Sequence, residues 1–396
     1  RDSCIYSHYR SLLNDAYEAE LAKRKMGESV LAYRRIPKAK GIGNKSNIHF
    51  AEDVFSKIIE LGDCLVYTLD ISKFFETLDH SRLKKLWKDV MGFSSLPADH
   101  FVVFRNVTRY ACVDRESLYR ELGFIGTKWV GTRQVQGYLT KRIPLQVCSG
   151  EVFREKITRL VRTNPNTYGI PQGSPISDVL ANLYLLDFDT AMMAEMNSLG
   201  GNYYRYSDDI LLIVPGHSDD VAARLQAVDV TLQASGKKLT IQAKKSTVHK
   251  FTKTADALTC KLLQGVVGKN GLEYLGFRFD GFRVFIRDST RSRLQRKMTF
   301  AVRASVRRLC KMNPGKGRSE LKQMFNESLV LRQFYKVRDF ETVSGVPKKW
   351  TFWTYVIRAQ KTFGDKGVPI GRQLRRFKQS IKHKANKAID TIIKMP

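Results

Sequence analysis

Two adjacent aspartates between two short apolar runs constrain the fold more than any other feature of this chain. Tyr203 and Tyr204 precede the tetrapeptide Tyr206-Ser207-Asp208-Asp209, and the apolar run Ile210-Leu211-Leu212-Ile213-Val214 follows it. This pattern predicts a β-hairpin with the carboxylates at its tip. Neighbouring carboxylates repel each other, and hard oxygen ligands of this kind suit a divalent cation. Ser-Asp-Asp is also ordinary turn chemistry, so the hairpin alone leaves both interpretations open.

A third aspartate ends an apolar segment upstream. The run Leu65-Val66-Tyr67-Thr68-Leu69-Asp70-Ile71 has the composition of a β-strand. One interpretation is that Asp70 caps a helix expected near Asp79 to Val90. The other is that the strand lies beside the hairpin, so that three carboxylates converge and hold two Mg²⁺ ions roughly 3.5–4 Å apart. Such a pair of ions supports nucleotidyl transfer, because it activates a hydroxyl and neutralises a triphosphate.

A loop rich in proline and glycine lies between these two segments. It reads Tyr168-Gly169-Ile170-Pro171-Gln172-Gly173-Ser174-Pro175-Ile176-Ser177. Ser174 followed by Pro175 predicts the N-cap and first turn of a helix. Glycine allows the backbone to approach a ligand closely, and a helix N-terminus favours phosphate. The apolar positions of the expected helix are Val179, Leu180, Leu183, Leu186 and Phe188.

In their order and spacing these three segments resemble motifs A, B and C of reverse transcriptases. Lys237-Lys238-Leu239-Thr240-Ile241 with Lys244-Lys245-Ser246 resembles motif D, and Leu272-Glu273-Tyr274-Leu275-Gly276-Phe277 resembles motif E, the primer grip. Tyr33-Arg34-Arg35-Ile36-Pro37-Lys38 is similar to the basic segment of the fingers. The resemblance covers roughly residues 30 to 285. It implies an α+β right-hand polymerase fold, with fingers and palm made of an antiparallel sheet plus helices, and a helical basic thumb.

The resemblance also implies a division of the chain. The expected parts are 1–62 for the N-terminal fingers, 63–91 for the palm with motif A, 92–167 for a fingers and palm insertion, 168–287 for the palm with motifs B to E, and 288–396 for the thumb. Within them we expect helices from about Asn47 to Leu61 and from Asp99 to Ala111.

Catalytic and metal-binding roles follow from the resemblance. Asp70 and Asp208 are implied as metal ligands with Asp209 assisting, and Ile71 next to Asp70 is placed in both the metal site and the nucleotide site. The implied cofactor is a pair of Mg²⁺ ions, for which Mn²⁺ can substitute. Lys245 is a candidate to protonate the leaving pyrophosphate, and the neighbouring Lys244 is almost as good a candidate.

The nucleotide contacts are implied in the same way. Phe75, five residues beyond Asp70, matches the steric gate of the family and leaves no space for a 2′-hydroxyl, which predicts a preference for deoxynucleotides. Phe74 is expected in the core. The residues that match positions at the templating pair and the incoming nucleotide are Gln172 and Gly173. The candidates for the triphosphate are Arg34, Arg35 and Lys38.

Positive charge is concentrated in the C-terminal third. The formal net charge is +30, and the residues from 291 to the end contain 27 Lys or Arg against 6 Asp or Glu. This asymmetry predicts a nucleic-acid clamp, and a merely solvated basic surface is the alternative. The apolar residues expected on the buried side of an amphipathic helix are Ile370, Leu374, Phe377, Ile381, Ala385, Ala388 and Ile392. The residues left for phosphates are Arg372, Arg375, Arg376, Lys378 and Lys382.

The cysteines and the hydropathy of the chain indicate the cellular location that we expect for it. The six cysteines show no Cys-x-x-Cys spacing, so we expect reduced thiols and a cytoplasmic protein. The longest apolar runs fall far short of the ~20 residues that span a bilayer, and no signal peptide is visible, so no membrane partner is expected.

Among relatives, elimination favours the stand-alone bacterial type found among defence-associated and abortive-infection, retron-like reverse transcriptases. About 110 residues follow motif E, too few for the further domains of group II intron enzymes, and the retron marks Asn-Ala-x-x-His and Val-Thr-Gly are absent. The expected partners are a noncoding RNA as template or primer, its DNA product, and deoxynucleoside triphosphates, in antiphage defence. The alternatives are untemplated or protein-primed DNA synthesis, a non-catalytic RNA-binding scaffold, an RNA-dependent RNA polymerase and a group II intron maturase. Template, priming mechanism and oligomeric state stay open.

Overall fold

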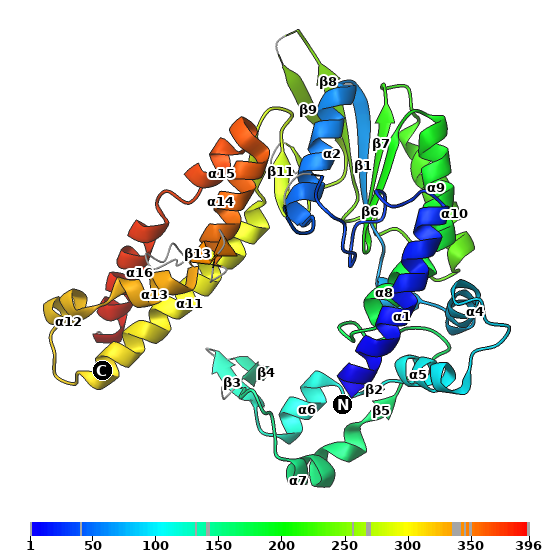
Figure 1. Cartoon of the computed structure of the whole chain (residues 1–396). Helices are drawn as coiled ribbons and strands as arrows, with labels where there is room; N and C mark the ends of the chain where they lie inside the picture. Colours follow the sequence, from blue (N-terminus) through cyan, green and yellow to red (C-terminus); the bar gives the residue numbers. More distant parts are fainter. Residues whose placement is uncertain are drawn as a thin grey trace.

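The computed structural model of the chain is shown in Figure 1. It describes residues 2–39, 42–130, 133–139, 143–255, 257–266, 271–334, 342–343, 346–347 and 351–393. The side chain of Lys378, a predicted phosphate contact, lies outside the described residues. Within these ranges, no helix is both long enough and apolar enough to cross a membrane.

The described residues form both helices and strands. The α-helices are α1 (Asp2–Lys23), α2 (Asn47–Leu61), α3 (Phe74–Thr77), α4 (His80–Val90), α5 (Ala98–Thr108), α6 (Arg115–Glu121), α7 (Gly150–Val152), α8 (Ser177–Tyr184), α9 (Leu186–Ser198), α10 (Val221–Ser235), α11 (Asp288–Met312), α12 (Arg318–Met324), α13 (Glu327–Phe334), α14 (Phe352–Phe363), α15 (Val368–Arg372) and α16 (Phe377–Ile393). The shorter turns are a π-helix η1 (Phe153–Ile157) and 3-10 helices η2 (Thr158–Leu160) and η3 (Gly364–Gly367).

The strands form one larger sheet and several small ones. They are β1 (Cys64–Asp70), β2 (Ala111–Cys112), β3 (Ile125–Val130), β4 (Arg133–Leu139), β5 (Arg162–Thr163), β6 (Asn202–Tyr206), β7 (Asp209–Pro215), β8 (Thr247–Lys253), β9 (Leu258–Gln264), β10 (Leu272–Tyr274), β11 (Phe277–Phe279), β12 (Val284–Ile286), β13 (Thr342–Val343) and β14 (Val346–Pro347). The mixed helix and sheet architecture that the sequence predicts is confirmed.

A five-stranded antiparallel sheet with the strand order β6-β7-β1-β8-β9 is the centre of the fold. Successive side chains of a strand face opposite sides of a sheet. On β1, Leu65, Tyr67 and Leu69 pack with α8 and α9 on one side, whereas Cys64 and Val66 pack with α2 and β10–β12 on the other. Burial on both faces explains why this strand reads as an almost continuous apolar run.

Aromatic contacts attach the second side of the sheet to the C-terminal helices. Phe55 of α2 stacks on Phe279 of β11, with ring centroids 4.9 Å apart. Phe277 on the same strand meets Phe363 of α14 edge to face at 5.0 Å. Rings of this size dominate the apolar area that such a contact buries. In Figure 1 the helices α11 to α16 extend from this side, whereas α5, α6, α7 and the hairpin of β3 and β4 lie below the sheet.

The predicted amphipathic segment at 370–392 is buried as expected but is not one helix. Its buried members line the contact with α11 and its neighbours: Ile370, Leu374, Phe377, Ile381 and Ala385. The chain leaves the helix between α15 and α16, where the Gln373 side chain accepts a hydrogen bond from the Ile286 backbone nitrogen at 2.9 Å and donates to its carbonyl at 3.3 Å. The Gln373 side chain thereby satisfies both backbone groups of Ile286 on β12. The prediction of one continuous helix is wrong here.

The helix that follows motif A begins as predicted and has its own cap. Asp79 accepts a hydrogen bond from the Arg82 backbone nitrogen at 2.8 Å, which is an ordinary N-cap contact. The capping interpretation of Asp70 is therefore wrong. The helix predicted at Asp99–Ala111 is shorter, because Ala111 pairs with Thr163 in the small sheet of β2 and β5.

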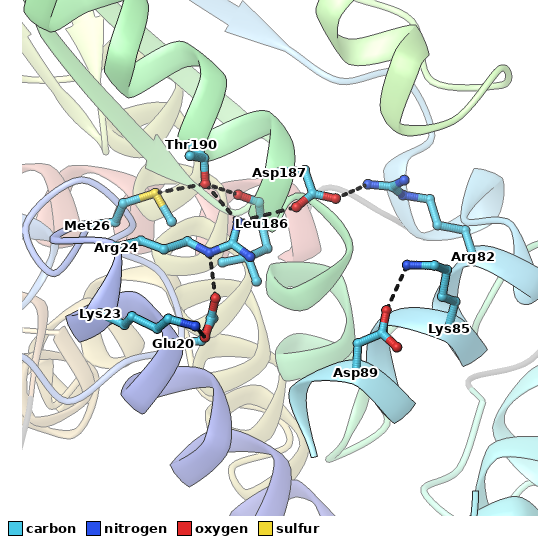
Figure 2. A network of polar contacts seen from close by, with 10 residues as sticks. All are labelled: Glu20, Lys23, Arg24, Met26, Arg82, Lys85, Asp89, Leu186, Asp187 and Thr190. Atoms are coloured by element: carbon cyan, nitrogen blue, oxygen red, sulfur yellow. Dashed lines mark hydrogen bonds and ion pairs between the residues drawn. The ribbon is translucent and has the colours of Figure 1, made fainter. Parts of the chain in front are cut away.

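A network of polar side chains connects α1, α4 and α9 at the surface (Figure 2). Arg24, just after α1, donates to Glu20 at 2.7 Å, to Asp187 at 3.3 Å and to Thr190 at 3.0 Å. Arg82 of α4 reaches the other oxygen of Asp187 at 3.0 Å. Half-exposed pairs of this kind contribute little stability singly, but together they fix where the chain leaves α1.

Candidate active site

The predicted hairpin is present, with a two-residue turn. β6 and β7 pair so that Tyr206 lies opposite Asp209, and Ser207 and Asp208 connect them. The backbone of Ser207 is left-handed, with φ at 61°, as tight hairpin turns require. Asp208 therefore lies in the turn itself, and Asp209 is the first residue of β7.

β1 lies beside β7 in the register that brings the third aspartate to the same end of the sheet. Asp70 is directly opposite Asp209. The Ile71 backbone nitrogen donates to the Asp208 carbonyl at 3.0 Å, and the Gln242 backbone nitrogen donates to the Asp70 carbonyl at 2.7 Å. The structure thus gathers Asp70, Asp208 and Asp209 from two separate stretches of backbone, the end of β1 and the hairpin, with the buried Ile71 next to Asp70.

Lys245 is the charged partner of this group. Its Nζ lies 3.0 Å and 3.2 Å from the two carboxylate oxygens of Asp70. Lys244 lines the same hollow, but the contact with Asp70 belongs to Lys245. The structure therefore separates two lysines that are equivalent in the sequence pattern.

The aspartates line an open hollow of about 740 Å³. Its other walls include Thr68 and Thr247, together with the ion pair of Arg287 and Glu273. Asp209 keeps contact with solvent, yet the surrounding protein removes enough water to raise the pKa of its carboxyl to about 6. Asp208 and Asp70 raise that pKa further, and Arg287 and Lys245 oppose them. The site concentrates negative charge that a cation would neutralise.

The donor atoms fit a hard divalent cation, because all three side chains are carboxylates. Lys245 forms an ion pair with Asp70 beside these donor atoms. Among the described residues, no group of three or more Asp, Glu, His or Cys side chains stands ready to hold a metal ion. The donor chemistry of the site is nonetheless suitable for a divalent cation.

The loop at 168–177 packs against the segment that follows Asp70. The Ile170 backbone nitrogen donates to the Phe75 carbonyl at 2.8 Å. Gly169 has φ at +88°, and a Cβ there would lie 3.0 Å from the Glu76 carbonyl oxygen, so a larger residue would be strained and would crowd this carbonyl. Gln172 and Gly173 lie exposed at the tip of the loop.

The helix after this loop starts later than predicted. α8 begins at Ser177, whose hydroxyl donates to the Pro171 carbonyl at 2.7 Å and keeps the preceding residues in a turn. The Ser174 hydroxyl caps no amide and, among the described residues, has no hydrogen-bond partner. The predicted Ser174 and Pro175 helix start is therefore wrong. The apolar positions are buried as expected, but α8 and α9 divide them at Leu185.

Both phenylalanines after motif A are largely buried. Phe74 is 3% exposed, in agreement with its predicted core position, and Phe75 is 9% exposed. Phe75 contributes its carbonyl to the contact with Ile170. The proposed steric gate is thus a rigidly packed ring beside the loop that carries Gln172.

The basic residues of the segment at 33–38 differ in their surroundings: one is bonded within the fold, and two are accessible to solvent. Arg34 is 7% exposed, and its guanidinium donates to both oxygens of Glu18 at 2.8 Å and 2.6 Å and to the carbonyls of Gly27 and Val30 at 2.6 Å each. The Arg34 guanidinium is therefore engaged by groups within the fold. Arg35 is exposed and Lys38 half-buried, so both remain available.

Three side chains that the sequence-based candidates omit support the hairpin turn: Tyr33, Asp189 and Arg205. A signal for Arg205 exists in the sequence. It lies two residues after Tyr203 on a strand, so both side chains face the core, where an arginine requires an acidic partner.

The carboxylates of Asp70, Asp208 and Asp209 lie together on adjacent antiparallel strands and their turn, with Lys245 beside them. A group of this composition is typical of a nucleotidyl-transfer site. A scan against families of known proteins gives a match to reverse transcriptase (RNA-dependent DNA polymerase) over residues 110–279. The match includes the loop at 168–177, the hairpin aspartates and Lys245, whereas Asp70 precedes it. Over these residues the chain is similar to RNA-directed DNA polymerases, which are nucleotidyltransferases and generally use divalent metal ions. No curated protein matches the chain.

Solved structures with related backbones are distant. Apo telomerase from Candida tropicalis is 11% identical with a TM-score of 0.42, covering 98% of this chain and 60% of that one. Its form truncated from the C-terminal domain is 12% identical with a TM-score of 0.34, covering 70% and 44%. Telomerase from Candida albicans in complex with a TWJ fragment of telomeric RNA is 11% identical with a TM-score of 0.37, covering 98% and 55%. The chain thus spans about half the length of these structures, and such weak likeness assigns it no function.

Proposed function

We propose that this protein extends a nucleic-acid strand with deoxynucleotides along an RNA template, with two divalent cations, preferably Mg²⁺, as cofactor. One observation carries the proposal: Asp70 lies directly opposite Asp209 across β1 and β7, with Asp208 in the adjoining turn. The family match over residues 110–279 supports the same reaction.

Each polar group of the site has a role in this reaction. Asp70 and Asp208 hold the cations with Asp209 and Ile71 beside them, and the cations, when bound, neutralise the triphosphate and activate the attacking hydroxyl. Lys245 carries a proton on Nζ next to Asp70 and supplies it to the leaving pyrophosphate.

We assign selection of the nucleotide to the packed ring of Phe75 and to the exposed loop that carries Gln172 and Gly173. Phe75 excludes a 2′-hydroxyl, since a ring held by the core cannot move aside. Gln172 and Gly173 contact the base pair being formed. Arg35 and Lys38 contact the triphosphate, whereas the buried contacts of Arg34 favour a supporting role for that residue.

The remaining parts of the chain are assigned to nucleic-acid binding. We place the fingers at 1–62, the palm at 63–91 and 168–287, the insertion between them at 92–167 and the thumb at 288–396. The basic C-terminal helices bind phosphates, because they carry most of the net charge of +30. A noncoding RNA partner, a bacterial source, a role in antiphage defence and a cytoplasmic location stay predictions from the sequence.

Primer extension tests the proposal. The purified chain is given a DNA primer on an RNA template with all four dNTPs or all four rNTPs, at a series of Mg²⁺ concentrations. We expect dNTP incorporation that disappears in Asp208→Asn/Asp209→Asn and persists in the control Asp365→Asn, an exposed aspartate of η3 in the C-terminal region. Equal use of rNTPs would favour an RNA polymerase. RNA binding without incorporation under any condition would favour a scaffold.

A further inference from the structure

The peptide that carries Asp208 is held by a buried arginine. Arg205 on β6 has no exposed surface, and its Nη1 donates to the Ser207 carbonyl at 3.0 Å. That carbonyl belongs to the peptide bond between Ser207 and Asp208. Because Ser207 has a left-handed backbone that most residues avoid, the turn needs support from outside to keep this conformation.

The guanidinium is itself held on the remaining sides. Its Nε and Nη2 donate to the two oxygens of Asp189 on α9 at 2.6 Å each, and Nη1 also reaches the Asn182 side chain on α8 at 3.1 Å. The Tyr203 hydroxyl donates to Asp189 at 2.5 Å. Burial lowers the pKa of Arg205, but the carboxylate of Asp189 raises it by more, so the group stays charged. We call Tyr203, Asp189 and Arg205 the turn triad.

A segment that precedes the family match supports the same strand. The Leu31 backbone nitrogen donates to the Arg205 carbonyl at 2.9 Å, and the Arg205 backbone nitrogen donates to the Ser29 carbonyl at 2.8 Å. Further along this segment, the Tyr33 hydroxyl lies 3.1 Å from the Ser207 hydroxyl. The turn is thus fixed from the core by Arg205 and from the other side by residues 29–33.

Stability alone does not account for the turn triad. Replacement of buried ion pairs by apolar side chains of similar volume is often neutral or stabilising, because a buried ion pair gains little over its desolvation cost. Apolar side chains cannot donate to the Ser207 carbonyl. The Arg205 guanidinium therefore adds a hydrogen bond that fixes the orientation of the peptide preceding Asp208.

We propose that Arg205 is a positioning residue that, with Asp189 and Tyr203, holds the Ser207–Asp208 peptide so that Asp208 and Asp209 face Asp70. This inference rests on the proposed function for its kinetic consequence, but its structural content concerns the turn alone. Misplacement of reacting groups by about 1 Å costs on the order of 100-fold in rate, so loss of the triad lowers kcat while substrate binding changes little.

The test replaces the whole triad with apolar residues, Tyr203→Phe/Asp189→Leu/Arg205→Met, to avoid leaving an unpaired buried charge. The chain offers a matched control, the triad of Tyr67, Asp219 and Arg224, in which a tyrosine hydroxyl and an arginine also share one aspartate. The control variant is Tyr67→Phe/Asp219→Leu/Arg224→Met. Primer extension provides kcat and KM for dNTP, and hydrogen exchange of the peptide spanning residues 203–212 reports on the turn.

For the turn-triad variant we expect a kcat lower by about 100-fold, a KM changed by less than about threefold, and faster exchange at the hairpin tip. The control variant should keep wild-type values in all three. A folded turn-triad variant with wild-type kcat and exchange overturns the inference. If the wild type incorporates no nucleotide on any template, the proposed function fails, and the exchange measurement still decides whether the triad orders the turn.

A second variant covers the case in which the triple variant does not fold. Arg205→Lys keeps the positive charge beside Asp189, but a single ammonium cannot reproduce the planar fork that reaches Asp189, Asn182 and the Ser207 carbonyl together. We expect a kcat reduced by at least about tenfold with the same KM and faster exchange at the tip. Wild-type kcat and exchange in this variant would overturn the inference as well.

Discussion

His249 provides a quantitative test of the burial of polar groups beside the candidate active site, because its pKa links this burial to the free energy of unfolding. It lies on β8 with 5% of its surface exposed, and burial lowers the pKa of its imidazole from 6.5 to about 4, against a smaller opposing effect of a hydrogen bond to the Gly271 backbone. The folded protein therefore resists protonation at pH values where the unfolded chain accepts a proton. The perturbation is His249→Leu, which keeps a buried apolar side chain and removes the titration.

The sign and size of the effect follow from these two values. Stability contributed by the neutral imidazole is complete above pH 6.5 and is lost as the pH falls from there toward about 4. At about 1.4 kcal/mol per pH unit, the loss amounts to about 3 kcal/mol over this interval. Asp209 acts in the opposite direction, because its pKa is raised to about 6 and its protonation favours the folded state. Comparison of the variant with the wild type removes the contribution of Asp209.

Urea unfolding at several pH values between about 7.5 and 4.5 measures the effect. We expect the free energy of unfolding of the wild type to fall relative to His249→Leu by most of about 3 kcal/mol across this range. His383→Leu, at an exposed position on α16, is the control and should follow the wild type. Parallel pH profiles for wild type and His249→Leu would refute the argument that burial keeps this imidazole neutral.

Four further substitutions test residues in the segments that are expected to surround the nucleotide. Phe75→Val should raise rNTP relative to dNTP incorporation by roughly 100-fold in competition primer extension, and an unchanged ratio would exclude the steric gate. Gly169→Ala should lower the free energy of unfolding by about 1–3 kcal/mol, measured by urea unfolding, because of its positive φ and the carbonyl of Glu76. Arg34→Met should destabilise the fold by about 1–3 kcal/mol. Arg35→Met should change stability by less than about 0.5 kcal/mol while raising KM for dNTP. The reverse pattern in urea unfolding and steady-state kinetics would reassign these two arginines.

The sequence by itself determines the features that depend on neighbouring residues. Alternating and continuous apolar runs around Asp70 and Asp209 predict β1 and β7, since side chains alternate along a strand and both faces of this sheet are buried. Local chemistry also accounts for two further features. Asp79 caps the start of α4, and Ser207 and Asp208 form the two-residue turn.

Tertiary structure alone decides the features that depend on distant partners. Whether β1 lies beside β7, and in which register, depends on the packing of two faces at once, and that register places Asp70 opposite Asp209. Lys245 differs from Lys244 because of a contact with a residue 175 positions away. Arg34 has the composition of a phosphate ligand, yet Glu18 and two backbone carbonyls occupy it. A side chain's role depends on which groups the fold brings to it, because one local pattern is compatible with many partners.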